Sequence, residues 1–148
     1  MKTRNNRAKI IVQLAMIFGI ICCFAATSMA AANVKKGKRR YNEFCTPCHG
    51  KNGMGDGTRM KVEKFDPAPR NHTDGNYMNR RTDVQLFKVI KDGGKSQNFS
   101  HIMPQWKHIL KDKEIWNVVA YIRSLAVNPK WTGTPLPPDP KFDKSQKN

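Results

Sequence analysis

A five-residue run, Cys45-Thr46-Pro47-Cys48-His49, constrains this chain more than any other part of its sequence. Two cysteines separated by two residues and followed directly by a histidine form the C-x-x-C-H pattern through which haem c is attached. The two thiols add across the haem vinyl groups, and the histidine that follows lies under the iron as an axial ligand. Cys45 and Cys48 are therefore predicted to hold one covalently bound haem c, with His49 as the proximal iron ligand.

Other uses of this run fit the rest of the chain less well. A structural zinc site takes four Cys or His ligands, and after residue 30 the sequence contains neither a second C-x-x-C pair nor an H-x₃₋₅-H pair. A thioredoxin-like dithiol would sit in a βαβ pattern, which the sequence does not show. A disulfide between Cys45 and Cys48 would leave His49 unexplained. Haem attachment is the favoured interpretation.

The first thirty residues have the three-part layout of a secretory signal. A basic segment over 1–9 precedes an apolar run of 17 residues from Ile10 to Ala26, and Ser28-Met29-Ala30 places small residues where signal peptidase reads them. The run is shorter than the roughly 20 residues of a typical spanning helix. We therefore expect a cleaved signal peptide over 1–30 and an exported, periplasmic protein, with an uncleaved membrane anchor as the alternative.

Length, charge and composition limit how the rest of the chain can be organised into domains. The chain has 148 residues, which argues for one domain. Removal of residues 1–30 takes away four basic residues and lowers the formal charge from +16 to +12. Five prolines and few apolar residues lie in 128–148, so that segment cannot bury enough surface to offset its ordering entropy. The sequence predicts a haem-binding domain over 31–127 and a flexible, basic, Pro-rich tail over 128–148.

Three helices are expected, over residues 34–45, 83–92 and 112–127. The second begins at a capping box of Thr82 and Gln85 and ends at Gly93, whereas Pro129 prevents continuation of the third. No alternating pattern of useful length indicates a strand, so the expected fold class is all-α. The residues expected to form the apolar faces are Val34, Gly37, Tyr41 and Phe44, then Val84, Phe87 and Ile90 with Leu86 and Val89 beside them, then Ile115, Val118, Val119, Ile122 and Leu125.

The second axial ligand is expected from the loop between the second and third helices. Met103 precedes Pro104, which holds the Met103 backbone extended and favours presentation of the thioether to the iron. Met103 is the predicted distal ligand, and His101 is its rival because two residues separate side chains on one side of an extended chain. The other candidates are interpreted as packing or surface residues: Met54, Met60 and Met78 as core filling, and His72 and His108 as surface.

Further side chains have expected roles around the cofactor. The loop near Pro67 and Pro69 is expected to supply a carbonyl for the His49 Nδ1–H. Trp106 and Arg70 are candidates for binding haem propionates, although core packing and a solvated charge explain them equally well.

Over most of 34–127 the sequence resembles class I cytochromes c. The resemblance rests on Gly37 and Tyr41, the C-T-P-C-H-G run, residues 86–94, Met103-Pro104, and residues 115–125. It implies a small helical shell around one haem, a crossing of the first and last helices near Ala120 and Tyr121, and iron ligation by His49 and Met103. Within that family, the sequence most resembles bacterial monohaem carriers and the haem domains of oxidases and reductases. Lys111 departs from the pattern, because the family often has a capping Ser or Thr there.

An iron with two strong protein ligands has no open position for substrate, so the expected function is one-electron transfer rather than catalysis. The chain would be a periplasmic carrier or the electron-transfer subunit of a respiratory complex. The alternative is a haem enzyme or gas-binding protein with an open or displaceable sixth site. Despite the basic charge, nucleic acid is not expected as the partner of an exported haem protein. Redox partners with acidic docking surfaces, or an anionic membrane surface, are expected instead.

Replacing Cys45 and Cys48 together by alanine should abolish covalent haem attachment and leave a largely unfolded chain, because so small a core is expected to be organised around its cofactor. The mass of the purified chain reports attachment, and circular dichroism reports helix content. A folded, helical double variant without haem would contradict this expectation.

Overall fold

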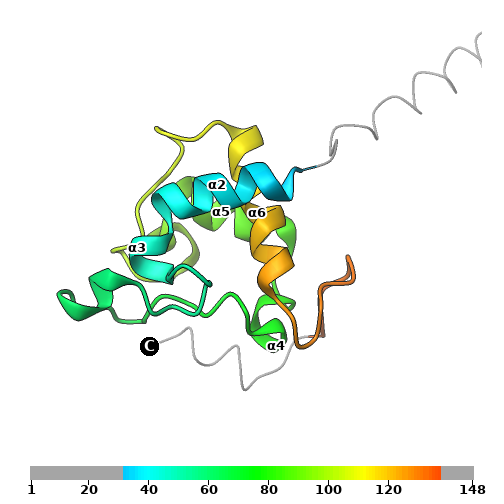
Figure 1. The fold of residues 1–148 in the computed structure, drawn as a ribbon, viewed down its shortest axis with the longest axis horizontal. Helices are drawn as coiled ribbons and strands as arrows, with labels where there is room; N and C mark the ends of the chain where they lie inside the picture. The colour runs from blue at the N-terminus through cyan, green and yellow to red at the C-terminus, as the bar shows by residue number, and fades with distance from the viewer. Residues whose placement is uncertain (1–31, 138–148) are drawn as a thin grey trace, which may run out of the picture. The chain divides into compact units, whose positions relative to one another are not determined.

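The computed structural model describes residues 32–137, and every regular element in that range is helical (Figure 1). A single isolated bridge, between Val127 and Lys130, is the β-type pairing in this range. The all-α expectation is thus confirmed. The elements in chain order are α2 (Val34–Phe44), α3 (Thr46–His49), the 3₁₀ helix η1 (Thr58–Lys61), α4 (Gly75–Met78), α5 (Asp83–Asp92), the 3₁₀ helix η2 (Gly94–Gln97) and α6 (Asp112–Leu125).

The three long helices begin and end close to the residues predicted from their caps. At the start of α5, the Thr82 hydroxyl accepts from Gln85 N at 3.1 Å, and the Gln85 side chain accepts from Thr82 N at 2.8 Å. This reciprocal pair is the predicted capping box. At α6, where Lys111 supplies no capping oxygen, the Glu114 carboxylate accepts from Lys111 N at 3.0 Å. Glu114 therefore supplies the half of a capping box that needs no Ser or Thr at position 111.

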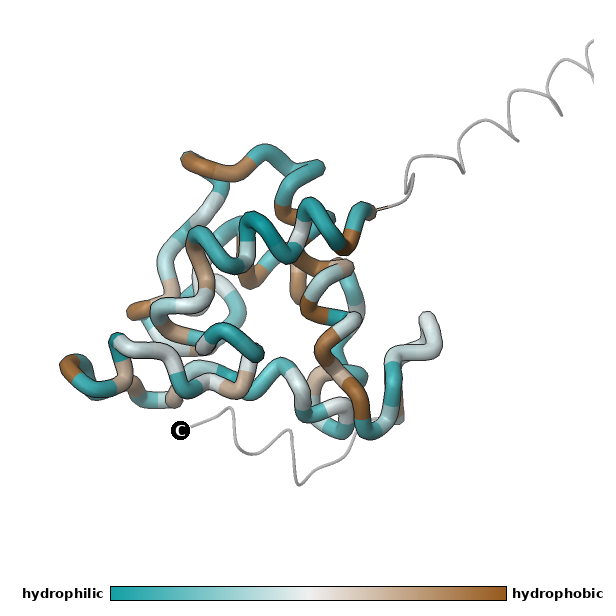
Figure 2. Tube along the Cα trace, in the orientation of Figure 1, coloured by the Kyte–Doolittle hydropathy of each residue, from teal (hydrophilic) through white to brown (hydrophobic). Residues whose placement is uncertain are grey.

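Helices α2 and α6 approach each other closely at Gly37. A Cβ on Gly37 would lie 1.8 Å from the Asn117 carbonyl oxygen, so only glycine permits this approach. One turn later Tyr41, which is fully buried, meets Tyr121 edge-to-face with ring centroids 5.1 Å apart. The implied crossing is confirmed, with its tightest point at Asn117. Most residues along α2 are hydrophilic (Figure 2).

The core lies among α2, α5 and α6, and its membership corrects two expectations. Val34 and Val84 are 45% and 52% exposed, although both were expected on apolar faces. On α5 the buried residues are Leu86 and Ile90, because the helix turns that edge toward α6. The apolar surface of α5 is wider than the strip it buries, so its sequence alone does not fix which edge faces inward.

Residues 127–137 pack against α4 and its neighbours. Val127 N donates a hydrogen bond to Thr73 O at 3.3 Å. Asn79 makes two hydrogen bonds to the segment: its Nδ2 donates to Pro129 O at 2.7 Å, and its backbone carbonyl accepts from Leu136 N at 2.7 Å. The Trp131 ring lies 3.6 Å from the Arg123 guanidinium carbon. The first part of the Pro-rich segment thus belongs to the packed unit. Residues 1–31, which include the expected signal peptide, and residues 138–148 lie outside the described range.

None of the helices within 32–137 has the length and apolar character needed to cross a membrane.

Gly37→Ala should lower the free energy of unfolding by about 2 kcal/mol or more, because the added methyl overlaps the Asn117 carbonyl and forces α2 away from α6. In an unobstructed helix a Gly→Ala change would raise the free energy of unfolding by about 1 kcal/mol. The sign of the measured change therefore distinguishes a tight crossing from an open one. Chemical denaturation of the haem-containing protein measures it, with Lys38→Ala at the next, exposed position as the control. Unchanged or increased stability would show that the crossing is not tight.

Candidate functional site

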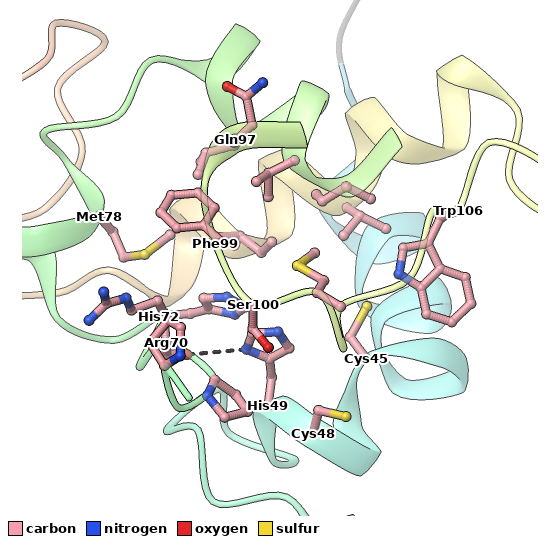
Figure 3. A pocket seen from close by; sticks show the side chains of 18 of the residues that line it. Cys45, Cys48, His49, Arg70, His72, Met78, Gln97, Phe99, Ser100 and Trp106 are labelled. Carbon is pink, nitrogen blue, oxygen red and sulfur yellow. Dashed lines mark hydrogen bonds between the residues drawn. The ribbon is translucent and has the colours of Figure 1, made fainter. Parts of the chain in front are cut away.

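The motif cysteines and histidine are brought together by a change of helix direction. Cys45 ends α2 and precedes α3, whose first turn is closed by His49 N donating to Cys45 O at 2.8 Å. As a result Cys45, Cys48 and His49 all line one cavity, which Figure 3 shows from close by. The two thiols are free, and burial raises the pKa of Cys45 to about 12 and also raises that of Cys48.

A glycine-rich loop folds back against this turn. Gly55 N donates to His49 O at 2.9 Å, and Gly57 N donates to Cys48 O at 3.1 Å. A Cβ on Gly57 would lie 2.2 Å from Pro47 O, so the loop reaches the α3 backbone only because this residue lacks a side chain. These contacts therefore hold the backbone of Cys48 and His49 in place.

The orientation of His49 is set by a backbone carbonyl. Its Nδ1 lies 3.2 Å from Arg70 O (Figure 3), and since a carbonyl only accepts, Nδ1 carries the proton. The predicted carbonyl near Pro69 is thereby confirmed. Burial lowers the pKa of His49, with the Arg70 carbonyl opposing the shift in part. The imidazole is thus neutral, and its Nε2 is the nitrogen left for a metal.

Met103 lines the same cavity from the loop that follows η2. Its carbonyl accepts from Gly94 N at 3.1 Å, and three residues later Trp106 N donates to Ile90 O at 3.1 Å. These two bonds tie the loop to the end of α5. His101, the rival candidate, is exposed and does not line the cavity. The geometry favours Met103 over His101.

The remaining methionine and histidine candidates differ in where they lie. Met78 is 3% exposed, belongs to the core as expected, and also lines the cavity. Met54 is 54% exposed, so its assignment to the core was wrong. His72 was expected on the surface, but it is 7% exposed and lines the cavity. Its polar ring is tolerated there because its Nδ1 lies 3.0 Å from the Tyr41 hydroxyl. His108 is exposed, as expected.

One wall of the cavity carries arginine side chains gathered around an aromatic ring. The guanidinium carbons of Arg70 and Arg81 lie 4.5 Å and 5.6 Å from the Tyr77 ring centroid. Arg70 Nε and Nη2 and Arg81 Nε are buried and have no hydrogen-bond acceptor among the described residues. Buried guanidinium nitrogens without acceptors are costly, so this wall calls for an anion.

Haem fits these residues on three independent grounds. Two thiols at the required spacing, a neutral imidazole and a thioether face one cavity. Its other walls are largely apolar, and Trp106 packs there on Phe44 with ring centroids 5.3 Å apart. Propionate carboxylates are the anions that would satisfy Arg70 and Arg81. The zinc alternative finds no support, because no group of three or more His, Cys, Asp or Glu in 32–137 could hold a metal ion.

Sequence reasoning missed His72 and Arg81 for different reasons. His72 sits between Asn71 and Thr73 in a polar stretch, and its partner Tyr41 lies 31 residues away, so no local signal marked it as buried. Arg81 follows Arg80, and two adjacent arginines are typical of a solvent-exposed, charged surface. The nearby Tyr77 was the available hint, because guanidinium groups stack on aromatic rings.

Known proteins resemble both the sequence and the fold. The family model for subunit III of cbb3-type cytochrome c oxidase matches residues 32–122. The cbb3-type cytochrome c oxidase subunit CcoP of Azospirillum brasilense is 29% identical over 113 residues, which are 76% of this chain and 35% of that protein.

Two solved structures also resemble this chain. A chain of the Kuenenia stuttgartiensis reducing HAO-like protein complex has a TM-score of 0.56 at 30% identity, over 70% of this chain and 47% of its own length. A c-type cytochrome has a TM-score of 0.48 at 20% identity, over 61% of this chain and 96% of its own length. The chain thus spans about a third of the curated relative and about half of the first solved chain.

Proposed function

The chain belongs to the cytochrome c family described by subunit III of cbb3-type cytochrome c oxidases, and on that premise we propose that it passes single electrons through a six-coordinate haem c. The cofactor of this family is covalently bound haem c, and its general use is electron transfer. The observation that carries the proposal is the meeting of Cys45, Cys48, His49 and Met103 in one cavity.

Each of these four residues has a proposed role. Cys45 and Cys48 form the thioethers, His49 binds the iron through Nε2, and Met103 binds it through sulfur. When bound, the haem supplies an iron that alternates between Fe(III) and Fe(II). The protein holds both ligands still: the Arg70 carbonyl fixes the imidazole, and the hydrogen bonds from Gly94 and Trp106 fix the Met103 loop. Small ligand movements between redox states suit fast transfer.

The cavity walls favour the reduced state in two ways. A thioether stabilises Fe(II) better than an imidazole does, and apolar surroundings disfavour the additional charge of Fe(III). Arg70 and Arg81 are proposed to bind the propionates, which is supported by their buried guanidinium nitrogens beside Tyr77. Two positive charges at that wall would further favour the electron-rich state.

The proposed setting is an exported carrier or a subunit of a redox complex. Support comes from the signal-like residues 1–30, and from relatives named as an oxidase subunit and as a member of a protein complex. The exposed face of α2 carries Lys35, Lys36, Lys38 and Arg39. Such a face suits redox partners with acidic docking surfaces, because complementary fields speed encounter.

Met103→Ala should remove the absorbance band of oxidised Met-ligated haem and allow the reduced protein to bind carbon monoxide, because the sixth position opens. Met103→His should keep the iron low-spin and lower its midpoint potential. Absorption spectra of both oxidation states and a potentiometric titration measure these effects.

Met78→Leu is the matched control for Met103, since Met78 is the other methionine shown to line the cavity. Met78→Leu and His101→Ala should both retain the Met-type band. If Met103→Ala retains the band and Met78→Leu loses it, Met78 is the ligand and the assignment of Met103 is wrong.

Electron transfer to the native partner should slow as ionic strength rises past about 0.1 M, where the Debye length is about 10 Å. Screening then weakens the attraction between the basic surface and an acidic partner. Stopped-flow rates over a salt series measure this, with a neutral small-molecule oxidant as the control whose rate should stay constant. A partner rate that is flat across the series would show that charge does not steer docking.

A further inference from the structure

A second histidine lies directly against the one in the haem motif. The rings of His49 and His72 are nearly parallel, with centroids 4.2 Å apart and planes inclined by 20°. The two residues come from different segments of the chain and lie side by side in the cavity wall (Figure 3). His72 therefore covers one face of the His49 ring, while the Arg70 carbonyl binds that ring at its Nδ1 edge.

His72 is itself held from two sides. Its Nδ1 lies 3.0 Å from the hydroxyl of Tyr41, and its backbone N–H donates to Gly53 O at 2.6 Å. Tyr41 is fully buried and packs edge-to-face on both His72 and Tyr121. The His72 ring is thus packed, through Tyr41, against the α2–α6 crossing.

We infer that His72 is a positioning residue that sets the plane of the His49 imidazole. A single hydrogen bond at Nδ1 leaves the imidazole free to tilt about the N–H···O direction, whereas contact with the ring face opposes that tilt. Two contacts, one at the edge and one at the face, define the plane. The inference rests on the proposed role of His49 as an iron ligand.

The histidine side chain does more here than fill space. Leucine or phenylalanine would also cover the His49 face, but neither could hydrogen bond to Tyr41, and a buried polar ring is costly unless it is bonded. The bond to Tyr41 fixes the rotation of the His72 ring, and that ring in turn fixes His49.

The test uses the full-length, haem-containing protein. Its variants are His72→Leu, which removes the aromatic face and the hydrogen bond, His72→Phe, which keeps an aromatic face, and Tyr41→Phe, which removes only the hydroxyl. His108→Phe, at an exposed histidine, is the matched control. The readouts are the largest g value of the oxidised protein by electron paramagnetic resonance and the spread of the haem methyl shifts by NMR, since both follow the orientation of the axial ligands. Thermal melting reports stability separately.

We expect His72→Leu to change the g value and the methyl spread, and Tyr41→Phe and His72→Phe to change both less and in the same direction. His108→Phe should change neither. If the His72 and Tyr41 variants melt earlier but keep the parent spectra, His72 merely packs the core and the inference is overturned. Should His72→Leu fail to fold, the two conservative variants decide the question by the same criterion.

Failure of the underlying proposal would be visible in the parent protein. A parent spectrum that lacks His–Met low-spin character overturns the ligand assignment and the positioning role together. A parent with that character, whose spectra are insensitive to His72 and Tyr41, overturns the positioning role alone.

Discussion

The contact between the backbone of Gly37 and the Asn117 carbonyl is the constraint on which the rest of the structure depends. It allows α2 and α6 to approach closely enough for Tyr41 to be buried completely between them. The end of α2, where Cys45 begins the turn into α3, is placed by the same approach. A contact between Gly37 and Asn117, neither of which lines the cavity, thus determines where the attachment motif stands relative to the core.

From this crossing a chain of aromatic rings leads to the cavity. Tyr121 contacts Tyr41, Tyr41 contacts His72, and His72 contacts His49. Helix packing and ligand orientation are therefore parts of one packed unit. The arginine wall behaves differently, because Arg70 and Arg81 reach the cavity with buried nitrogens that the described residues do not satisfy. On the His49 side the chain satisfies Nδ1 of the ring and leaves Nε2 open, whereas on the arginine side buried nitrogens have no acceptor among the described residues.

Features encoded by neighbouring residues could be predicted from the sequence, and features encoded by distant ones could not. The capping box at Thr82, the stop before Pro129 and the attachment motif are local signals, and the long helices follow from them to within two residues. Which edge of α5 faces inward depends on α6, so the prediction that Val84 lies on the buried face was wrong. The burial of His72 depends on Tyr41, and the packing of residues 127–137 depends on Asn79. The ligand roles of Cys45, Cys48, His49 and Met103 stay predictions, whereas their assembly in one cavity is a property of the fold.

The make-up of the cavity wall also has a consequence for the order of assembly. Cys45 faces a space whose walls include Met103 and extend to Ile122, so the enclosure is complete only when almost the whole domain has folded. A rigid planar molecule the size of a porphyrin cannot slip past interlocked side chains of native density. If Cys45 and Cys48 hold haem c as proposed, thioether formation is easiest while the chain is still open, and residues up to Ile122 then fold around a group that is already bonded. Folding of the domain would in that case be the final step of its own chemical maturation.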